Sequence, residues 1–243
     1  MERKIQVYAS LHELARAAAN KIINIAYYAI QSQDRATIAL AGGNTPRPVY
    51  ELLATPPYCD QIQWQKIHLF WGDERAVPPD HPDSNFRMAN EALLGNIPIP
   101  DENVHRIRGE LEPSAAAAEY ADLLRKIPGG IPPQFTLVLL GLGADGHTAS
   151  LFPQTTAVEE RSRNVVEVYV SKLKAWRVTL TLPVLNAASH IIFLVSGRQK
   201  AETVQKILAR DPNNPDPLLP ASLIQPTHGQ LTWMLDREAA SLL

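Results

Sequence analysis

Three short apolar segments, each followed directly by a turn that contains glycine, constrain the fold of this chain most strongly. Residues 36–41, 66–71 and 135–140 read ATIALA, KIHLFW and FTLVLL. A strand that is covered on both faces is nearly continuously apolar, whereas a strand with one wet face alternates apolar and polar residues. The three segments therefore predict buried strands of a largely parallel sheet.

Segments with helical periodicity separate these strands. Residues 11–31 carry apolar side chains three and four positions apart, and Ser10 with Glu13 forms a capping-box pattern at the start. Strands that alternate with helices indicate an α/β fold with helices on both faces of the sheet. Further helices are expected at residues 48–54, 85–94, 113–126 and 197–209, and further strands at 4–9, 165–170, 177–182, 191–195 and 231–235.

The length and composition fit one globular domain over residues 1–243. Hydrophobic residues make up 45% of the chain and charged residues 20%, which suits a sizeable core. The formal net charge is −2, so the chain lacks the broad positive field that would hold nucleic acid or an anionic membrane. A local group of basic side chains can still bind a small anion.

The chain is expected to be a soluble cytoplasmic protein. Cys59 is its one cysteine, so no intrachain disulfide is possible, as in proteins of reducing compartments. The first ten residues, MERKIQVYAS, have neither the apolar centre nor the cleavage site of a signal peptide. No apolar run approaches the roughly 20 residues that span a bilayer.

The first candidate binding segment follows the strand at 36–41. It comprises Gly42, Gly43, Asn44 and Thr45, and Arg47 follows after a proline. Ligands of open α/β sheets bind outside the carboxyl ends of the strands, and glycines let the backbone approach an anion there. The segment is interpreted as a phosphate cradle, and the alternative is an ordinary strand-to-helix turn.

The second candidate segment, Gly72-Asp73-Glu74-Arg75, follows the strand at 66–71. Arg75 has the chemistry to bind a phosphate or to stabilise a developing oxyanion. Asp73 has the chemistry to orient a base or a substrate hydroxyl. The alternative is a solvated loop with an internal ion pair.

The third segment joins the strand at 135–140 to the sequence GLGADGHTASLFP. Gly143 belongs to a run of glycines that exposes backbone N–H groups, and Asp145 stands two residues before His147. A carboxylate beside an imidazole holds its tautomer and raises its basicity, so such a histidine can deprotonate water near neutral pH. The alternative is a glycine-rich turn with a surface histidine.

Two further basic residues are weaker candidates. Lys200, at the start of the helix expected at 197–209, either closes a phosphate site or is simply solvated. Arg177 opens a predicted strand and either faces the site or lies on the surface. The remaining histidines make no metal-ligand spacing, and no metal site is predicted. Ser150 is not in a nucleophile elbow, and Cys59 has no partner base for covalent catalysis.

The segments AGGNTPRPVYELL, FWGDERAVPPDHPDSNFRMANEALL and LGLGADGHTASLFP, in this order, resemble the 6-phosphogluconolactonase family. The resemblance extends over nearly the whole chain. It implies a Rossmann-like sheet and hydrolysis of 6-phospho-D-glucono-1,5-lactone to 6-phospho-D-gluconate in the oxidative pentose phosphate pathway, without a cofactor. The substrate is then a small phosphorylated sugar lactone.

The resemblance also implies roles for individual residues. His147 matches the histidine proposed to activate water, and Asp145 matches the acid of the same motif. Asp73 and Arg75 match the GDER segment, whose arginine contacts substrate. Arg47 and Lys200 match positions that resemble phosphate ligands, and the resemblance does not settle which basic residue meets the phosphate.

Two other functions remain to be weighed. Sugar-phosphate deaminases and isomerases have a similar turn that reads DGHIAFNEP, but Phe152 stands here at the position of their glutamate. A non-catalytic sugar-phosphate sensor would usually carry a DNA-binding region, for which the chain has no room before its first strand. Functional coupling to glucose-6-phosphate dehydrogenase is neither supported nor excluded by the sequence.

Overall fold

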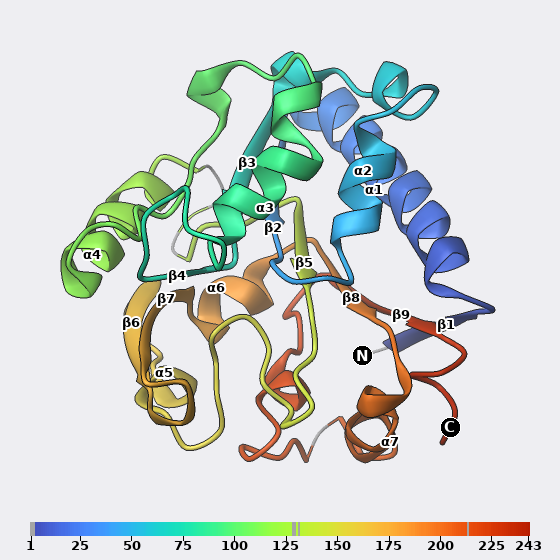
Figure 1. Cartoon of the computed structure of the whole chain (residues 1–243), viewed down its shortest axis with the longest axis vertical. Helices are drawn as coiled ribbons and strands as arrows, with labels where there is room; N and C mark the ends of the chain where they lie inside the picture. Colours follow the sequence, from blue (N-terminus) through green and yellow to red (C-terminus); the bar gives the residue numbers. More distant parts are fainter. Residues whose placement is uncertain (1–2, 128–129, 131, 213) are drawn as a thin grey trace.

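The computed structural model describes residues 3–127, 130, 132–212 and 214–243, and its centre is a six-stranded sheet (Figure 1). The strand order is β1-β9-β8-β5-β2-β3, and every neighbouring pair is parallel. The predicted parallel α/β sheet is therefore confirmed. The strands are β1 (Arg3–Tyr8), β2 (Ala36–Leu40), β3 (Ile67–Trp71), β5 (Leu137–Leu140), β8 (His190–Val195) and β9 (Gln230–Asp236).

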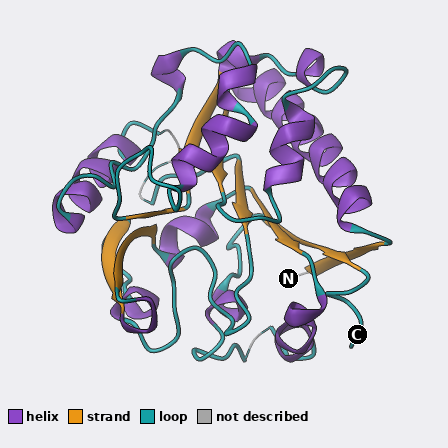
Figure 2. Cartoon of the chain, in the orientation of Figure 1, coloured by secondary structure: helices purple, strands orange, loops and turns teal. Residues whose placement is uncertain are grey.

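Helices cover both faces of this sheet (Figure 2). Helices α1, α2 and α3 lie together on one side, and α6 lies on the other (Figure 1). Ser10 caps α1 as predicted, because its side chain accepts from Glu13 N. The helices are α1 (Leu11–Gln33), α2 (Arg47–Leu53), α3 (Asn85–Ala92), α4 (Pro113–Leu124), α5 (Thr156–Glu159), α6 (Leu182–Ala187) and α7 (Ala201–Leu208).

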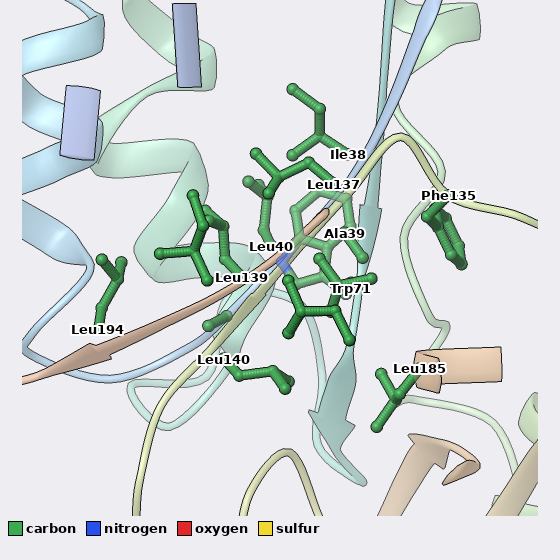
Figure 3. Packing of buried hydrophobic residues seen from close by; sticks show 14 of the residues in the cluster. Ile38, Ala39, Leu40, Trp71, Phe135, Leu137, Leu139, Leu140, Leu185 and Leu194 are labelled. Carbon is green, nitrogen blue, oxygen red and sulfur yellow. The ribbon is translucent and has the colours of Figure 1, made fainter. Parts of the chain in front are cut away.

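The central strands carry the core. Every residue of β2 and of β5 is buried, as expected of strands that are covered on both faces. Leu185 of α6 faces these strands from one side, opposite the side on which α1–α3 lie (Figure 3). Burial of this apolar cluster fixes the register of the strands, so the turns that follow β2, β3 and β5 meet at one edge of the sheet.

A second, smaller sheet was not foreseen. The segments expected as strands at 165–170 and 177–182 form β6 (Val165–Val170) and β7 (Ala175–Leu180), which pair antiparallel outside the central sheet. Only four residues join them, too few for a parallel crossover. The third strand, β4 (Asp73–Arg75), pairs with β7 and was expected to be a turn. The short helices α5 and α6 were also not predicted.

Two further details complete the comparison with the predicted elements. The helix expected at 197–209 begins with a 3₁₀ turn, Arg198–Lys200, before α7. Within the described part of the chain, no helix is both long and apolar enough to cross a membrane.

Candidate active site

A cavity of about 460 Å³ opens at the carboxyl ends of β2, β3, β5 and β8. The three turns singled out in the sequence all line it, together with residues of the small sheet and with Gln199 and Lys200 of the 3₁₀ turn before α7. It therefore occupies the place where ligands of open α/β sheets bind. Of the predicted site residues, Gly42, Gly43, Asn44, Thr45, Asp73, Arg75, Gly143, His147, Arg177 and Lys200 line it.

His147 lies in this cavity with one ring nitrogen engaged and one open. Its Nδ1 lies 2.5 Å from Oδ1 of Asp145, and Asp145 also pairs with Lys172 through Oδ2. The ring stacks on Phe152 at 4.1 Å between centroids. A carboxylate on Nδ1 favours the tautomer with the proton there, so Nε2 carries a lone pair. Nε2 has no hydrogen-bond partner among the described residues.

The glycine at position 143 is required by this arrangement. A Cβ on Gly143 would lie 1.9 Å from Nδ1 of His147 and 2.6 Å from Oδ1 of Asp145. The turn closes through Gly143 N, which donates to the carbonyl oxygen of His147 at 2.8 Å. Any side chain at this position would therefore separate the imidazole from its carboxylate.

The surroundings of His147 keep its imidazole neutral and lower its basicity, contrary to the rise expected from the neighbouring carboxylate. Burial lowers its pKa to about 4, and the charge of Asp73 opposes this shift. The cations Lys200, Arg177 and Arg75 lower the pKa further. At neutral pH the ring is thus unprotonated and can accept a proton through Nε2.

The alternation of side chains along β4 explains why some residues of the GDER segment face the cavity and one is buried. Successive side chains of a strand point to opposite faces, so Asp73 and Arg75 face the cavity and Glu74 faces away. Glu74 is buried and accepts hydrogen bonds from the backbone N–H groups of Asn85 and Phe86, at 2.7 Å each, at the start of α3. Burial raises the pKa of Glu74, although these hydrogen bonds act to lower it. The alternative of a solvated loop is wrong for this segment.

Four cations line the cavity, and two of them, Arg177 and Lys200, are unpaired among the described residues. Arg75 and Arg177 stand directly opposite each other in the β4–β7 ladder. Arg75 donates to the carbonyl of Asp83, whereas the side chains of Arg177 and Lys200 have no hydrogen-bond or ion-pair partner among the described residues. Burial lowers the pKa of Arg177, and Arg75 adds to that shift. Like charges directly opposite are destabilising, so this arrangement favours an anionic ligand between them.

The first turn presents backbone to the cavity. A Cβ on Gly42 would lie 1.8 Å from Oδ1 of Asn85, so α3 packs directly against this glycine. Gly43 has φ 96°, a conformation that side chains disfavour, and its Cβ position is open. Asn44 and Thr45 follow at the same rim.

Arg47 is placed elsewhere. Its Nε lies 3.0 Å from Glu51, and its Nη2 lies 3.7 Å from Glu91 on α3. It is the first residue of α2 and does not line the cavity. Its charge is thus engaged by two carboxylates, so the geometry does not bring this expected phosphate ligand to the other cations.

Four cavity residues were not assigned a role from the sequence. Asn85 and Ser150 both contact Asp73, Phe152 stacks on His147, and Lys172 pairs with Asp145. Asn85, Ser150 and Phe152 lie within the quoted motifs, so their position was a usable signal. Lys172 lies in the turn between β6 and β7, and no sequence pattern marks it.

Groups for a metal are not assembled within the described ranges, where no three His, Cys, Asp or Glu side chains come together as potential ligands. The charged and titratable groups at the cavity are instead one imidazole, the Asp73 carboxylate and several cations, beside glycine-rich backbone. Such a set suits a polyanionic organic substrate and acid–base chemistry.

Comparison with known proteins identifies the family of this chain. The family model described as glucosamine-6-phosphate isomerases/6-phosphogluconolactonase matches residues 9–233. This chain belongs to that family. Its relatives include the 6-phosphogluconolactonase of Nostoc sp., which is 40% identical over 247 residues, or 100% of this chain and 99% of the relative.

Two other members of the glucosamine-6-phosphate isomerase/6-phosphogluconolactonase family support the assignment. The 6-phosphogluconolactonase of Synechocystis sp. is 43% identical over 219 residues, which cover 88% of each protein. The solved 6-phosphogluconolactonase of Trypanosoma brucei is similar to this structure with a TM-score of 0.87, at 33% identity, over 100% of this chain and 99% of that one. The similarity therefore extends over the whole fold of this chain.

Proposed function

We propose that this chain is a hydrolase that converts 6-phospho-D-glucono-1,5-lactone to 6-phospho-D-gluconate, a step of the oxidative pentose phosphate pathway. The observation that carries the proposal is the open Nε2 of a neutral His147 in one cavity with the unpaired side chains of Arg177 and Lys200. The names and similarity of the relatives support the same substrate.

In the proposed mechanism, His147 acts as a general base. Its Nε2 takes a proton from water, and the resulting hydroxide adds to the lactone carbonyl carbon. Asp145 holds the proton on Nδ1, and the charges of Asp145 and Asp73 stabilise the imidazolium that forms. General base catalysis of this kind contributes roughly 10²–10⁴-fold to the rate.

Collapse of the tetrahedral intermediate opens the ring. The C–O bond to the ring oxygen breaks, and the imidazolium of His147 returns its proton to that oxygen. The product first carries a carboxylic acid and a new hydroxyl, and the acid then releases its proton to solvent and becomes the carboxylate. The reaction therefore consumes one water and needs no redox partner. Backbone N–H groups of the glycine-rich turn after β5 are proposed to supply hydrogen bonds for the oxyanion.

The phosphate provides binding energy far from the reacting carbonyl. Arg75, Arg177, Lys200 and the backbone of the Gly42–Thr45 turn are the groups proposed to hold it. Anchoring the distant phosphate positions the carbonyl against the water, which is how remote binding energy accelerates a reaction. Arg47 is left out of this set because it is paired with Glu51.

The deciding experiment is a coupled assay that generates the lactone in situ from glucose 6-phosphate and follows its loss with and without the protein. A rate well above spontaneous hydrolysis is expected for the wild type. Loss of the lactone at the spontaneous rate, together with ammonia release from glucosamine 6-phosphate, would favour the deaminase instead. Binding of 6-phosphogluconate without turnover would favour the sensor.

The site favours the lactonase over the deaminase for a structural reason. Phe152, at the position of the deaminase glutamate, packs its ring on His147 and under Lys172. An aromatic ring at this place supplies no carboxylate for proton relay during ring opening. Cytoplasmic location and functional coupling to glucose-6-phosphate dehydrogenase stay predictions.

A further inference from the structure

Asp73 lies among cations but pairs with none of them. It faces the cavity from β4 beside Arg75, and its charge acts on Arg177, whose pKa it raises against the lowering effects of burial and of Arg75. Within the described part of the chain, neither guanidinium forms an ion pair with it. Carboxylates and guanidiniums that can reach each other normally form short, charge-assisted hydrogen bonds. Something must therefore hold the Asp73 carboxylate in place.

The main contact of the carboxylate is a serine from a different segment. Ser150 Oγ donates to Oδ2 of Asp73 at 2.6 Å. On the other side, Asn85 Nδ2 donates to the carbonyl oxygen of Asp73 at 2.8 Å and lies 3.4 Å from its Oδ1. The serine hydroxyl thus satisfies the oxygen that would otherwise be free to turn toward a cation.

Both contacts are anchored by buried groups. Ser150 is 1% exposed, and its backbone N–H donates to Thr179 Oγ1 at 3.2 Å. Thr179 is the partner of Asp73 in the β4–β7 register and is fully buried. Asn85 is also buried and begins α3, where Glu74 accepts from its backbone N–H. Neither contact depends on a mobile surface side chain.

We propose that Ser150 is a positioning residue that keeps the Asp73 carboxylate off Arg177, so that the guanidinium remains available to an anionic ligand. Asn85 supplies the second contact and fixes the backbone of Asp73. An Asp73–Arg177 ion pair would occupy the N–H groups that the ligand needs and would cancel the positive charge of the cavity. The inference rests on the proposed function only for the identity of the anion.

The structural test uses the Ser150→Ala variant of the full chain. Its crystal structure is expected to show an oxygen of Asp73 within about 4 Å of an Arg177 nitrogen, the usual limit of an ion pair. A carboxylate that keeps its wild-type orientation in this variant overturns the proposal. This readout needs no substrate, so it decides the matter even if the proposed lactonase activity is absent.

The energetic test measures binding of 6-phosphogluconate by calorimetry. Loss of one charge-assisted hydrogen bond to the ligand is expected to raise Kd roughly 10–100-fold in Ser150→Ala. In the Asp73→Asn background, which removes the competing carboxylate, Ser150→Ala is expected to change Kd less than about twofold. An equal loss in both backgrounds would mean that Ser150 acts only on packing, and would overturn the proposal.

A matched control separates positioning from stability. Ser84 is a second buried serine of the same region, and its Oγ donates to Glu74 at 3.1 Å rather than to Asp73. Ser84→Ala is expected to lower the melting temperature but to leave Kd near the wild-type value. A Kd shift in Ser84→Ala as large as that in Ser150→Ala would contradict a specific role for Ser150. If wild type fails to bind 6-phosphogluconate at all, the proposed function fails, and the crystallographic readout still decides the role of Ser150.

Discussion

Two half-buried histidines of this protein, His147 and His105, differ in whether a ring nitrogen without a partner faces the cavity. Burial is the main cause that lowers the pKa of each to about 4, so both rings are neutral at pH 7. His105 stacks on Phe70 at 4.4 Å between centroids, and its Nε2 lies 3.1 Å from Nδ1 of His68. It lies outside the cavity lining, at the flank of β3.

The same contrast separates the arginines of the two regions. Arg106, next to His105, makes a bidentate pair with Glu110 at 2.7 and 2.8 Å and lies over the ring of Phe86. Arg177, at the cavity, has no such partner among the described residues. A lowered pKa alone therefore does not mark a catalytic group. A catalytic site is marked instead by several unsatisfied donors and acceptors that face the same cavity.

The largest expected effect is the loss of the base. Replacing His147 with Ala is expected to lower kcat for the lactone roughly 10²–10⁴-fold. Among the described residues that line the cavity, no other histidine is present to replace it as the base. The measurement is the initial rate in the coupled assay, corrected for spontaneous hydrolysis. Activity within about tenfold of wild type would remove His147 as the base.

Removal of Arg177, one of the two unpaired cations, should act on substrate affinity. Arg177→Met is expected to raise KM roughly 10–100-fold, since a hydrogen bond to a charged group contributes about 1.5–3 kcal/mol. Arg106→Met is the matched control, because its guanidinium is already engaged by Glu110. Equal KM values for the two variants would contradict the distinction between the unpaired arginine at the cavity and the paired arginine outside it.

Replacement of His105, which lies outside the cavity, should affect stability and not turnover. His105→Leu leaves Nδ1 of the half-buried His68 without its partner, which is expected to cost about 0.5–1.5 kcal/mol of unfolding free energy. Denaturant unfolding at pH 7 measures this cost. The coupled assay should meanwhile give kcat within about twofold of wild type, and a rate loss like that of His147→Ala would contradict a purely structural role for His105.

The pH dependence of stability follows from the lowered pKa values of His147 and His105. A histidine whose pKa falls from its ordinary 6.5 to about 4 on folding takes up a proton when the chain unfolds between these values. Stability due to burying the neutral ring is therefore complete above pH 6.5 and is lost as pH falls toward 4. Unfolding titrations at pH 7 and 4.5 are expected to show a smaller decrease for His105→Leu than for wild type.

The smallest expected effect is a shift of the acidic limb of the rate profile. In free enzyme, kcat/KM is expected to fall as His147 is protonated near its pKa of about 4. Bound phosphate neutralises the cations that lower this pKa, so the limb of kcat should lie at higher pH than that of kcat/KM. Coincident limbs, or limbs that move with His105→Leu, would indicate another titrating group.

The order of elements was largely predictable because it depends on local pattern. The apolar segments at 36–41, 66–71 and 135–140 became β2, β3 and β5, and the capping pattern at Ser10 marked the start of α1. The small antiparallel sheet was not predictable in the same way. Its strands alternate like any half-covered strand, and their partner, β4, is three residues long and resembles a turn.

The candidate site was predictable by segment but not by residue. Lys200 was the weaker candidate in the sequence, yet it faces the cavity, whereas Arg47 pairs with Glu51 and Glu91. Arg177 was ambiguous until the β4–β7 register placed it opposite Arg75. Lys172 could not be found, because only the docking of the β6–β7 turn brings it to Asp145.

By itself the sequence determined the parallel sheet, the three polar turns at its carboxyl edge and the neighbouring pair Asp145 and His147. These features depend on contacts within a strand, a turn or a helix, which composition and spacing encode. Tertiary structure alone decided which cations stay unpaired and which carboxylate faces them. Partners such as Ser150 and Asp73 are 77 residues apart in the chain, and only the packed core brings them within hydrogen-bond distance.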